Sequence, residues 1–122
     1  MDKVEAIIRP EALQGVQDAL DELGVSGLTV SEVVGCGRQK GYTEQYRGAR
    51  VTISLLHKIK VEAVVPSEVV GPAVEAIVTA ARTGEEGDGR VFVIPVAQAV
   101  RIRTGENGED SVRHEAPAGW GH

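Results

Sequence analysis

The chain has 122 residues, with 13 Lys and Arg against 18 Asp and Glu, so its net charge is −5 when the three His are neutral. This acidic balance argues against a nucleic-acid-binding protein, which would carry a basic excess. The length predicts one domain that buries roughly two thirds of the surface its unfolded chain exposes. No apolar run is long enough for a membrane span or a signal-peptide core. The single cysteine, Cys36, excludes an internal disulfide, and we expect a cytoplasmic protein that is not embedded in a membrane.

The first half of the chain predicts a strand, a helix and a second strand. Residues 4–9 are rich in strand formers and run into Pro10, which suits the first turn of a helix. The helix that follows carries apolar residues at helical spacing, namely Leu13, Val16, Leu20 and Leu23. Gly24 is suited to end it. A strand is expected over residues 28–34, and a long polar loop over about 37–54. Loops of that length in small domains are usually functional.

The second half predicts the same order again. Residues 56–65 alternate in polarity, which indicates a strand with Ile59, Val61, Ala63 and Val65 on its core face. A helix is expected from Ser67 to about residue 82, with a later start or a kink because Pro72 lies beyond the first turn. A strand over 90–96 and a short last strand over 100–104 complete the pattern. After Gly105 the chain is expected to be mobile.

An internal repeat supports this order. Residues 4–8 (VEAII) match residues 61–65 (VEAVV) at an offset of 57, and each copy is followed closely by proline and a helix. Two β-α-β units predict an α+β fold of the ferredoxin-like type, with an antiparallel sheet that carries both helices on one face. The other face would bear Ile7, Val64, Phe92 and Ile94 among charges. Self-association would cover such a face.

Three sequence features are suited to bind phosphate. Arg101 and Arg103 are two apart on the expected last strand, which would place their guanidinium groups on one side, roughly 6 to 7 Å apart. Residues 83–90 (TGEEGDGR) form a glycine-rich turn whose backbone N–H groups would approach phosphate oxygens beside Arg90. Residues 35–41 (GCGRQKG) form a second glycine cluster, in a region where residues 36–60 carry a local net charge of +5. Each feature alone is also typical of a solvated surface, but together they favour a phosphate ligand.

Several segments resemble the PII nitrogen-regulatory signal proteins. These are residues 4–10, 37–41 (GRQKG), 46–49 (YRGA), 81–84 (ARTG), 87–93 (GDGRVFV) and 100–105 (VRIRTG), in collinear order over about residues 1–110. The resemblance implies one domain over 1–112, with a T-loop at about 37–54 and a flexible tail over 113–122. It implies a homotrimer that binds ATP or ADP between subunits, and often 2-oxoglutarate with Mg²⁺. The T-loop would dock on a target enzyme or membrane transporter.

The resemblance also implies the residues of each ligand site. The nucleotide would be bound by two sets of residues. The phosphate set comprises Gly37, Arg38, Gly87, Asp88, Gly89, Arg90, Arg101 and Arg103. The set near the base and ribose comprises Ile7, Thr29, Gly35, Glu62 and Val64. The 2-oxoglutarate site would comprise Gln39, Lys40, Gly41 and Lys58, with Gln39 also bound to Mg²⁺. For Lys58 the alternative is a solvated strand residue.

The sequence departs from the common PII pattern in the loop. Many bacterial members carry a tyrosine five residues after Tyr46 that is nucleotidylated, whereas this chain has Val51, which has no hydroxyl group. Cys36 stands where a larger aromatic is common and His57 where proline is common. Nucleotidylation is therefore not expected at this position.

We carry three interpretations of function. The first is a non-catalytic regulator that binds ATP or ADP and 2-oxoglutarate. The second is a small phosphotransferase or phosphatase on the same fold, which would need a nucleophile or base close to phosphate, and only His57 of the three His lies within the expected domain. The third is a sensor of adenylate alone that acts on a transporter of something other than ammonium.

Overall fold

The computed structural model describes residues 1–38 and 53–113. Its elements follow the order β1 (Asp2–Ile8), η1 (Pro10–Ala12), α1 (Leu13–Glu22), β2 (Thr29–Arg38), β3 (Ile53–Val65), α2 (Ser67–Ala81), β4 (Gly89–Pro95) and η2 (Gly108–Val112), where η marks a short 3-10 helix. The two β-α-β units expected from the sequence are thus confirmed.

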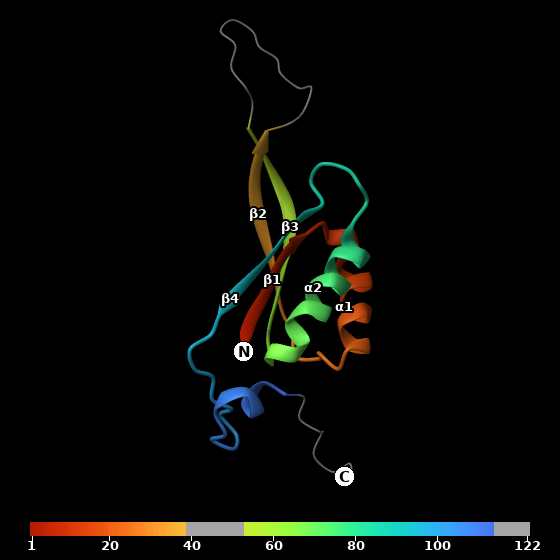
Figure 1. Ribbon diagram of the computed structural model, residues 1–122. Coiled ribbons are helices and arrows are strands. Elements are labelled where there is room, and N and C mark those ends of the chain that lie inside the picture. The colour runs from red at the N-terminus through yellow and green to blue at the C-terminus, as the bar shows by residue number, and fades with distance from the viewer. Residues whose placement is uncertain (39–52, 114–122) are drawn as a thin grey trace, which may run out of the picture.

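The sheet is antiparallel, with strand order β2-β3-β1-β4, and both helices cover one of its faces (Figure 1). The two copies of the internal repeat are the two central strands, where Val4 pairs with Ala63 and Ile8 pairs with Ile59. Each copy is buried under a helix, which explains why both are rich in small and β-branched residues.

The core lies between the sheet and the helices. The predicted inward residues of β3 are buried, with 2% exposure at Val61 and Val65 and 8% at Ile59 and Ala63. Alternate residues of β1 complete this sheet layer, and the helices contribute Val16, Leu20, Ala73, Ile77 and Ala81. The period-two and helical patterns therefore identified the buried faces correctly.

Helix α2 begins at Ser67, as expected, and Pro72 lies inside it, so the alternative of a later start is wrong. Its first turn gains an acceptor from a residue far along the chain. The Glu109 carboxylate accepts hydrogen bonds from Ser67 Oγ at 2.8 Å and from Ser67 N–H at 3.3 Å. These bonds lower the pKa of Glu109 to about 2, first through the Ser67 hydroxyl and then through the Met1 ammonium group. A carboxylate near the N-terminus of a helix also interacts favourably with the positive end of the helix dipole.

The expected strand over 100–104 does not form. Val100 makes one isolated bridge with Asn107, and Arg101 and Gly105 close a turn, with Gly105 N–H donating to the Arg101 carbonyl at 2.8 Å. The positive φ of 77° at Gly105 reverses the chain and prevents an extended segment. The segment after this glycine is also ordered as far as Arg113, contrary to expectation, because η2 is tied to α2 by Glu109 and by an Arg113–Glu68 ion pair of 2.7 Å. The expected flexible tail beyond Arg113 lies outside the described residues.

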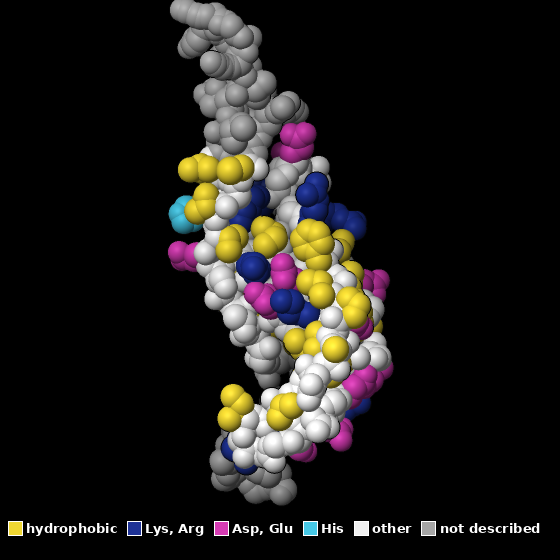
Figure 2. Space-filling view, turned by 90° about the vertical axis from the view of Figure 1, so that its left-hand side faces the viewer, with side chains coloured by type: hydrophobic (Ala, Val, Ile, Leu, Met, Phe, Trp, Pro, Cys, Tyr) yellow, Lys and Arg dark blue, Asp and Glu magenta, His cyan; other side chains and the backbone are white. Residues whose placement is uncertain are grey.

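The sheet face opposite the helices mixes apolar and charged side chains, as expected (Figure 2). Phe92 is 44% exposed and Ile94 is 39% exposed. Between them and β3, Lys3 Nζ lies 3.2 Å from Glu62 and 3.4 Å from Glu5, and hydrogen bonds to these carboxylates raise the pKa of Lys3. None of the helices in residues 1–38 and 53–113 is long and apolar enough to cross a membrane.

Candidate nucleotide-binding site

The glycine-rich turn between α2 and β4 is organised by one carboxylate. Asp88 accepts hydrogen bonds from Thr83 N–H at 2.8 Å, Gly84 N–H at 2.9 Å and Thr83 Oγ1. Arg9 Nε adds a hydrogen bond to the same carboxylate at 3.1 Å. These contacts, led by those with Thr83, hold the pKa of Asp88 well below its usual range. Asp88 is thus ionised at neutral pH and fixes the path of the turn.

Glycine is required where the turn enters β4. Gly89 has φ +109°, and a Cβ atom built on it would lie 1.8 Å from the carbonyl oxygen of Ile7. Real Cβ atoms essentially never approach any atom this closely. Gly84 and Gly87 also have positive φ, at 92° and 95°. The turn therefore brings bare backbone close to the end of β1.

Two cationic side chains border this turn. Lys58 Nζ donates to the carbonyl oxygen of Gly87 at 2.6 Å, and Arg9 Nη2 donates to that of Glu86 at 2.6 Å. Arg90 follows the turn and pairs with Ile7 across the sheet. The structure therefore gathers Arg9, Lys58 and Arg90 around one glycine turn.

Arg9 had not been identified as a candidate from the sequence. In the sequence Arg9 is simply the residue before Pro10, and its partner Asp88 lies 79 positions away. Only the antiparallel pairing of β1 with β4 brings the two residues together. No local pattern around Arg9 indicates this contact.

The other residues suggested for the base and ribose lie on the outer face of the sheet. Cross-strand partners share a face, and Thr29 pairs with Glu62 while Lys58 pairs with Val33 on β2. Gly35 pairs with Leu56 further along the same two strands. Ile7 and Val64 are half-buried on the same face. These positions form a continuous surface that runs from the glycine turn toward the opposite end of the sheet.

Arg101 lies at that opposite end. Gly89 pairs with Ile8 and Pro95 pairs with Asp2, so the length of β4, about 20 Å, separates the glycine turn from the chain that follows Pro95. Arg101 forms an ion pair with Glu106, and its Nη2 donates to the carbonyl of Arg113 at 2.8 Å. Because residues 101–104 form a turn, the expected pair of parallel guanidinium groups on a strand is wrong.

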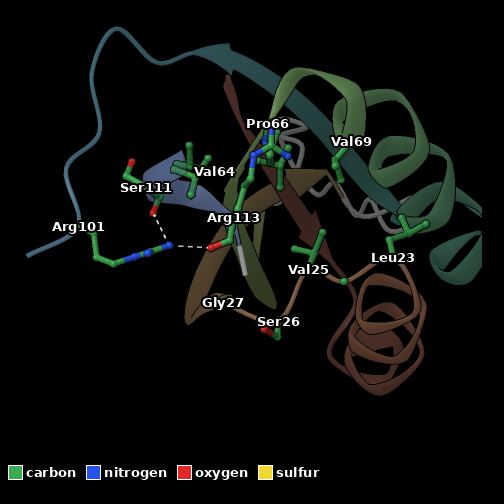
Figure 3. Close-up of a pocket in the computed structure, with 13 residues that line it drawn as sticks. Leu23, Val25, Ser26, Gly27, Val64, Pro66, Val69, Arg101, Ser111 and Arg113 are labelled. Atoms are coloured by element: carbon green, nitrogen blue, oxygen red, sulfur yellow. Dashed lines mark hydrogen bonds between the residues drawn. The ribbon is translucent and has the colours of Figure 1, made fainter. Parts of the chain in front are cut away.

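Arg101 lines a cavity of about 580 Å³, which we call the C-terminal pocket (Figure 3). Leu23, Val25 and Val69 form its apolar side, Val64 and Pro66 border it from the junction of β3 and α2, and Arg101, Ser111 and Arg113 form its polar side. A space of this volume is within the range of small-molecule pockets. Arg103, two positions after Arg101, is exposed and does not line the C-terminal pocket.

Part of the expected site lies outside the described residues. Gln39, Lys40 and Gly41 belong to this part, as does the departure at Val51. Gly37 and Arg38 are the last two residues of β2. Among the residues that are described, no group of three or more His, Cys, Asp or Glu is placed to hold a metal ion.

Comparison with known proteins identifies the family. The sequence matches the family described as nitrogen regulatory protein P-II over residues 1–106. It is 58% identical to the nitrogen regulatory protein P-II of Rhodobacter capsulatus and 49% identical to nitrogen regulatory protein P-II 1 of Escherichia coli K12, in each case over 112 residues that cover 92% of this chain and 100% of the relative.

Its structure is similar to that of Bacillus subtilis GlnK, with a TM-score of 0.77 and 37% identity over 90% of this chain and 96% of that one. In the described part of this chain, the matched fold is a four-stranded antiparallel sheet with two helices on one face. The chain therefore belongs to the P-II family of nitrogen regulatory signal-transduction proteins.

Proposed function

We propose that this P-II protein binds ATP or ADP in a cleft shared between copies of a homotrimer and reports the bound nucleotide through its loop at 37–54. The target would be an enzyme of nitrogen metabolism or a membrane transporter, and the protein itself would act without catalysis in the cytoplasm. The family assignment supports a regulatory role, and the geometry of the cations supports the shared cleft.

The observation that carries the proposal is the separation of the phosphate-binding candidates. Arg90 and the glycine turn lie at one end of β4, and Arg101 follows its other end, about 20 Å away. Arginine side chains cannot bridge that distance to grip the same phosphate group. If both ends contribute to one site, Arg101 and Arg103 must reach the glycine turn of a neighbouring copy.

The outer face of the sheet supports association of copies. Phe92 and Ile94 are exposed there beside ion-paired Lys3 and Glu62. An apolar surface of this kind is unfavourable in water and favours burial against an identical face. A closed ring of three copies would bury all such faces and form three equivalent clefts.

In this cleft, the backbone N–H groups of the glycine turn and the cations Arg38 and Arg90 would bind phosphate oxygens. Asp88 would act indirectly, because its carboxylate already accepts hydrogen bonds from Thr83 and Gly84 and would repel a phosphate. Ile7, Thr29, Gly35, Glu62 and Val64 would line the base and ribose on the outer face.

We further propose that 2-oxoglutarate binds beside ATP with Mg²⁺, through Gln39, Lys40, Gly41 and Lys58. The described residues offer no carboxylate cluster for Mg²⁺, which fits a cation held mainly by phosphate and ligand oxygens with few protein ligands. Lys58 fits the role of a carboxylate partner, because its ammonium group already lies at the glycine turn, 2.6 Å from the Gly87 carbonyl. When bound, Mg²⁺ would neutralise the charges that the phosphates and the 2-oxo acid bring together.

Signalling requires that ligands differ in their effect on the loop. ATP and ADP would occupy one cleft, and only one ligand set would stabilise the loop conformation that binds the target. The glycine turn and Lys58 lie at the same end of the sheet as the start of the loop, because β2 ends at Arg38 and β3 begins at Ile53. A ligand at this turn is therefore positioned to influence the base of the loop.

Two measurements test the proposal. Analytical ultracentrifugation at micromolar concentration is expected to give a trimer, and isothermal titration calorimetry is expected to show ADP and Mg-ATP binding without nucleotide turnover. A monomer that still binds nucleotide would refute the shared cleft. A trimer that binds no nucleotide would refute the ligand assignment, and hydrolysis by the pure protein would favour the phosphatase alternative.

A further inference from the structure

The C-terminal pocket adjoins the point where the described chain stops. Arg113, the last described residue, lines the pocket together with Ser111 and Val112. It is held there by its ion pair with Glu68 at 2.7 Å and by its carbonyl, which accepts a hydrogen bond from Arg101 at 2.8 Å (Figure 3). The described chain therefore ends at the wall of this pocket.

The segment after Arg113 is unusual in composition. It reads HEAPAGWGH and contains Trp120, the single tryptophan of the chain, between Gly119 and Gly121. The alignments with the R. capsulatus and E. coli proteins cover those proteins completely with 112 of this chain's 122 residues. Each alignment therefore leaves ten residues of this chain unmatched.

The pocket has the chemistry that an indole ring prefers. Leu23, Val25 and Val69 supply apolar surface, and Leu23 remains 39% exposed. Arg101 on the opposite side supplies a guanidinium group, which binds favourably against the face of tryptophan. An indole combines a large apolar body with one N–H donor, so it suits a pocket with one apolar and one polar side.

The tether allows this contact. Trp120 follows Arg113 by seven positions, which span up to about 25 Å when extended. Two groups on one chain that are joined by a few residues meet at an effective concentration in the millimolar range when the connection can span the distance between them. The flanking glycines give the backbone the freedom to turn back toward the pocket.

We propose that the C-terminal pocket is the docking site of the chain's own segment 114–122, with Trp120 in the pocket. Because Val64 and Arg101 also line this pocket, the docked segment would compete with nucleotide for access. This second part rests on the function proposed above, whereas the docking itself does not.

The docking is tested without nucleotide, by the intrinsic fluorescence of the full chain, since Trp120 is its single tryptophan. The change Leu23→Asp alters an exposed residue of the pocket and should leave folding intact. We expect it to shift the Trp120 emission to longer wavelength and to increase quenching by acrylamide. The matched control is Val34→Asp, which alters an exposed residue of β2 outside the pocket and should leave both signals unchanged.

Two results would overturn the docking. One is equal emission and quenching for wild type and Leu23→Asp. The other is an unchanged emission together with a smaller sedimenting species for Leu23→Asp, which would assign the pocket to contact with a second copy. If Leu23→Asp fails to fold, Ser26→Glu provides a second pocket variant, because Ser26 is also exposed and lines the pocket.

The competition is tested by calorimetric titration with ADP. Docking in roughly 70 to 90% of molecules leaves about 10 to 30% open, so Trp120→Ala should bind ADP three- to tenfold more tightly than wild type. His122→Ala is the control and should bind ADP as wild type does. Equal affinity of Trp120→Ala and wild type would refute the competition. If no variant binds ADP, the proposed nucleotide function fails and with it the competition, while the fluorescence still decides whether the segment docks.

Discussion

Replacement of Gly89 by alanine tests the geometry of the glycine turn most directly. The added Cβ would lie 1.8 Å from the Ile7 carbonyl oxygen and 2.9 Å from its carbon, both of which are backbone atoms of β1. No flexible side chain can move aside, so the end of β4 must separate from β1. This end is held by the pairs Ile7 with Arg90 and Ile8 with Gly89.

The magnitude follows from two costs. An alanine held at a sparsely populated positive φ costs on the order of 1 to 3 kcal/mol. Loss of one or two backbone hydrogen bonds at the strand end costs about 0.5 to 1.5 kcal/mol each. We therefore expect Gly89→Ala to lower the free energy of unfolding by about 1.5 to 6 kcal/mol.

Two other glycines provide matched controls. Gly84 also has positive φ, at 92°, but a Cβ there meets nothing within 4 Å, so Gly84→Ala should incur only the conformational cost. Gly71 lies within α2 with equally open surroundings. Gly71→Ala should change the free energy of unfolding less than Gly84→Ala does, because the gain in helix propensity of roughly 0.5 to 1 kcal/mol is opposed by the steric effect of Pro72 on a Cβ at the residue before it.

The assay is urea unfolding at one fixed protein concentration, because association makes the midpoint depend on concentration. Gly89→Ala should be less stable than Gly84→Ala by about 1 to 3 kcal/mol, the part due to the broken strand pairing. Equal destabilisation of the two variants would show that the close approach to Ile7 carries no cost, and the reasoning would be wrong.

Three further predictions concern the site. The hydrogen bonds that Asp88 accepts make the pKa of its carboxyl group lower in the folded chain than in the unfolded chain. The contribution of Asp88 to stability is therefore fully present above the unfolded pKa, and it is lost as the pH falls through the lower pKa of the folded chain. Asp88→Asn should therefore flatten the acid loss of stability, measured as the urea midpoint against pH, and a parallel decline in both proteins would contradict this. Arg103→Ala should weaken ADP and ATP binding alike by roughly 1.5 to 3 kcal/mol in calorimetry, because both ligands share the phosphates it would contact; unchanged affinities would remove Arg103 from the site. Gln39→Ala should abolish 2-oxoglutarate binding in the presence of Mg-ATP and leave ADP binding intact, with wild type as the necessary control. Normal 2-oxoglutarate binding by that variant would show that its metal role is wrong.

Periodicity by itself determined much of the fold. Alternation over residues 56–65 identified the buried face of β3, and the repeat of residues 4–8 at 61–65 identified the two central strands. These inferences succeed because burial of one face is a local property, which the spacing of apolar residues records. The family motifs likewise lie in the sequence, and comparison with known proteins confirmed them.

The C-terminal region shows where local patterns mislead. Residues 100–104 alternate in polarity like a strand, yet Gly105 turns the chain before a partner strand is available. Strand propensity has little meaning without a neighbouring strand. The contact of Glu109 with the start of α2 is likewise not evident from local patterns, because Glu109 lies 42 positions from Ser67.

The site depends most on tertiary structure. The sequence by itself determined that glycines and cations suited to phosphate occur in residues 83–90 and near 101–103. Only the folded chain decided that Arg9 and Lys58 join the glycine turn and that Arg101 lies at the far end of the sheet. The physical reason is that a binding site is set by which strand ends meet in space. In an antiparallel sheet those ends belong to residues separated by tens of positions, which no local pattern of the chain can record.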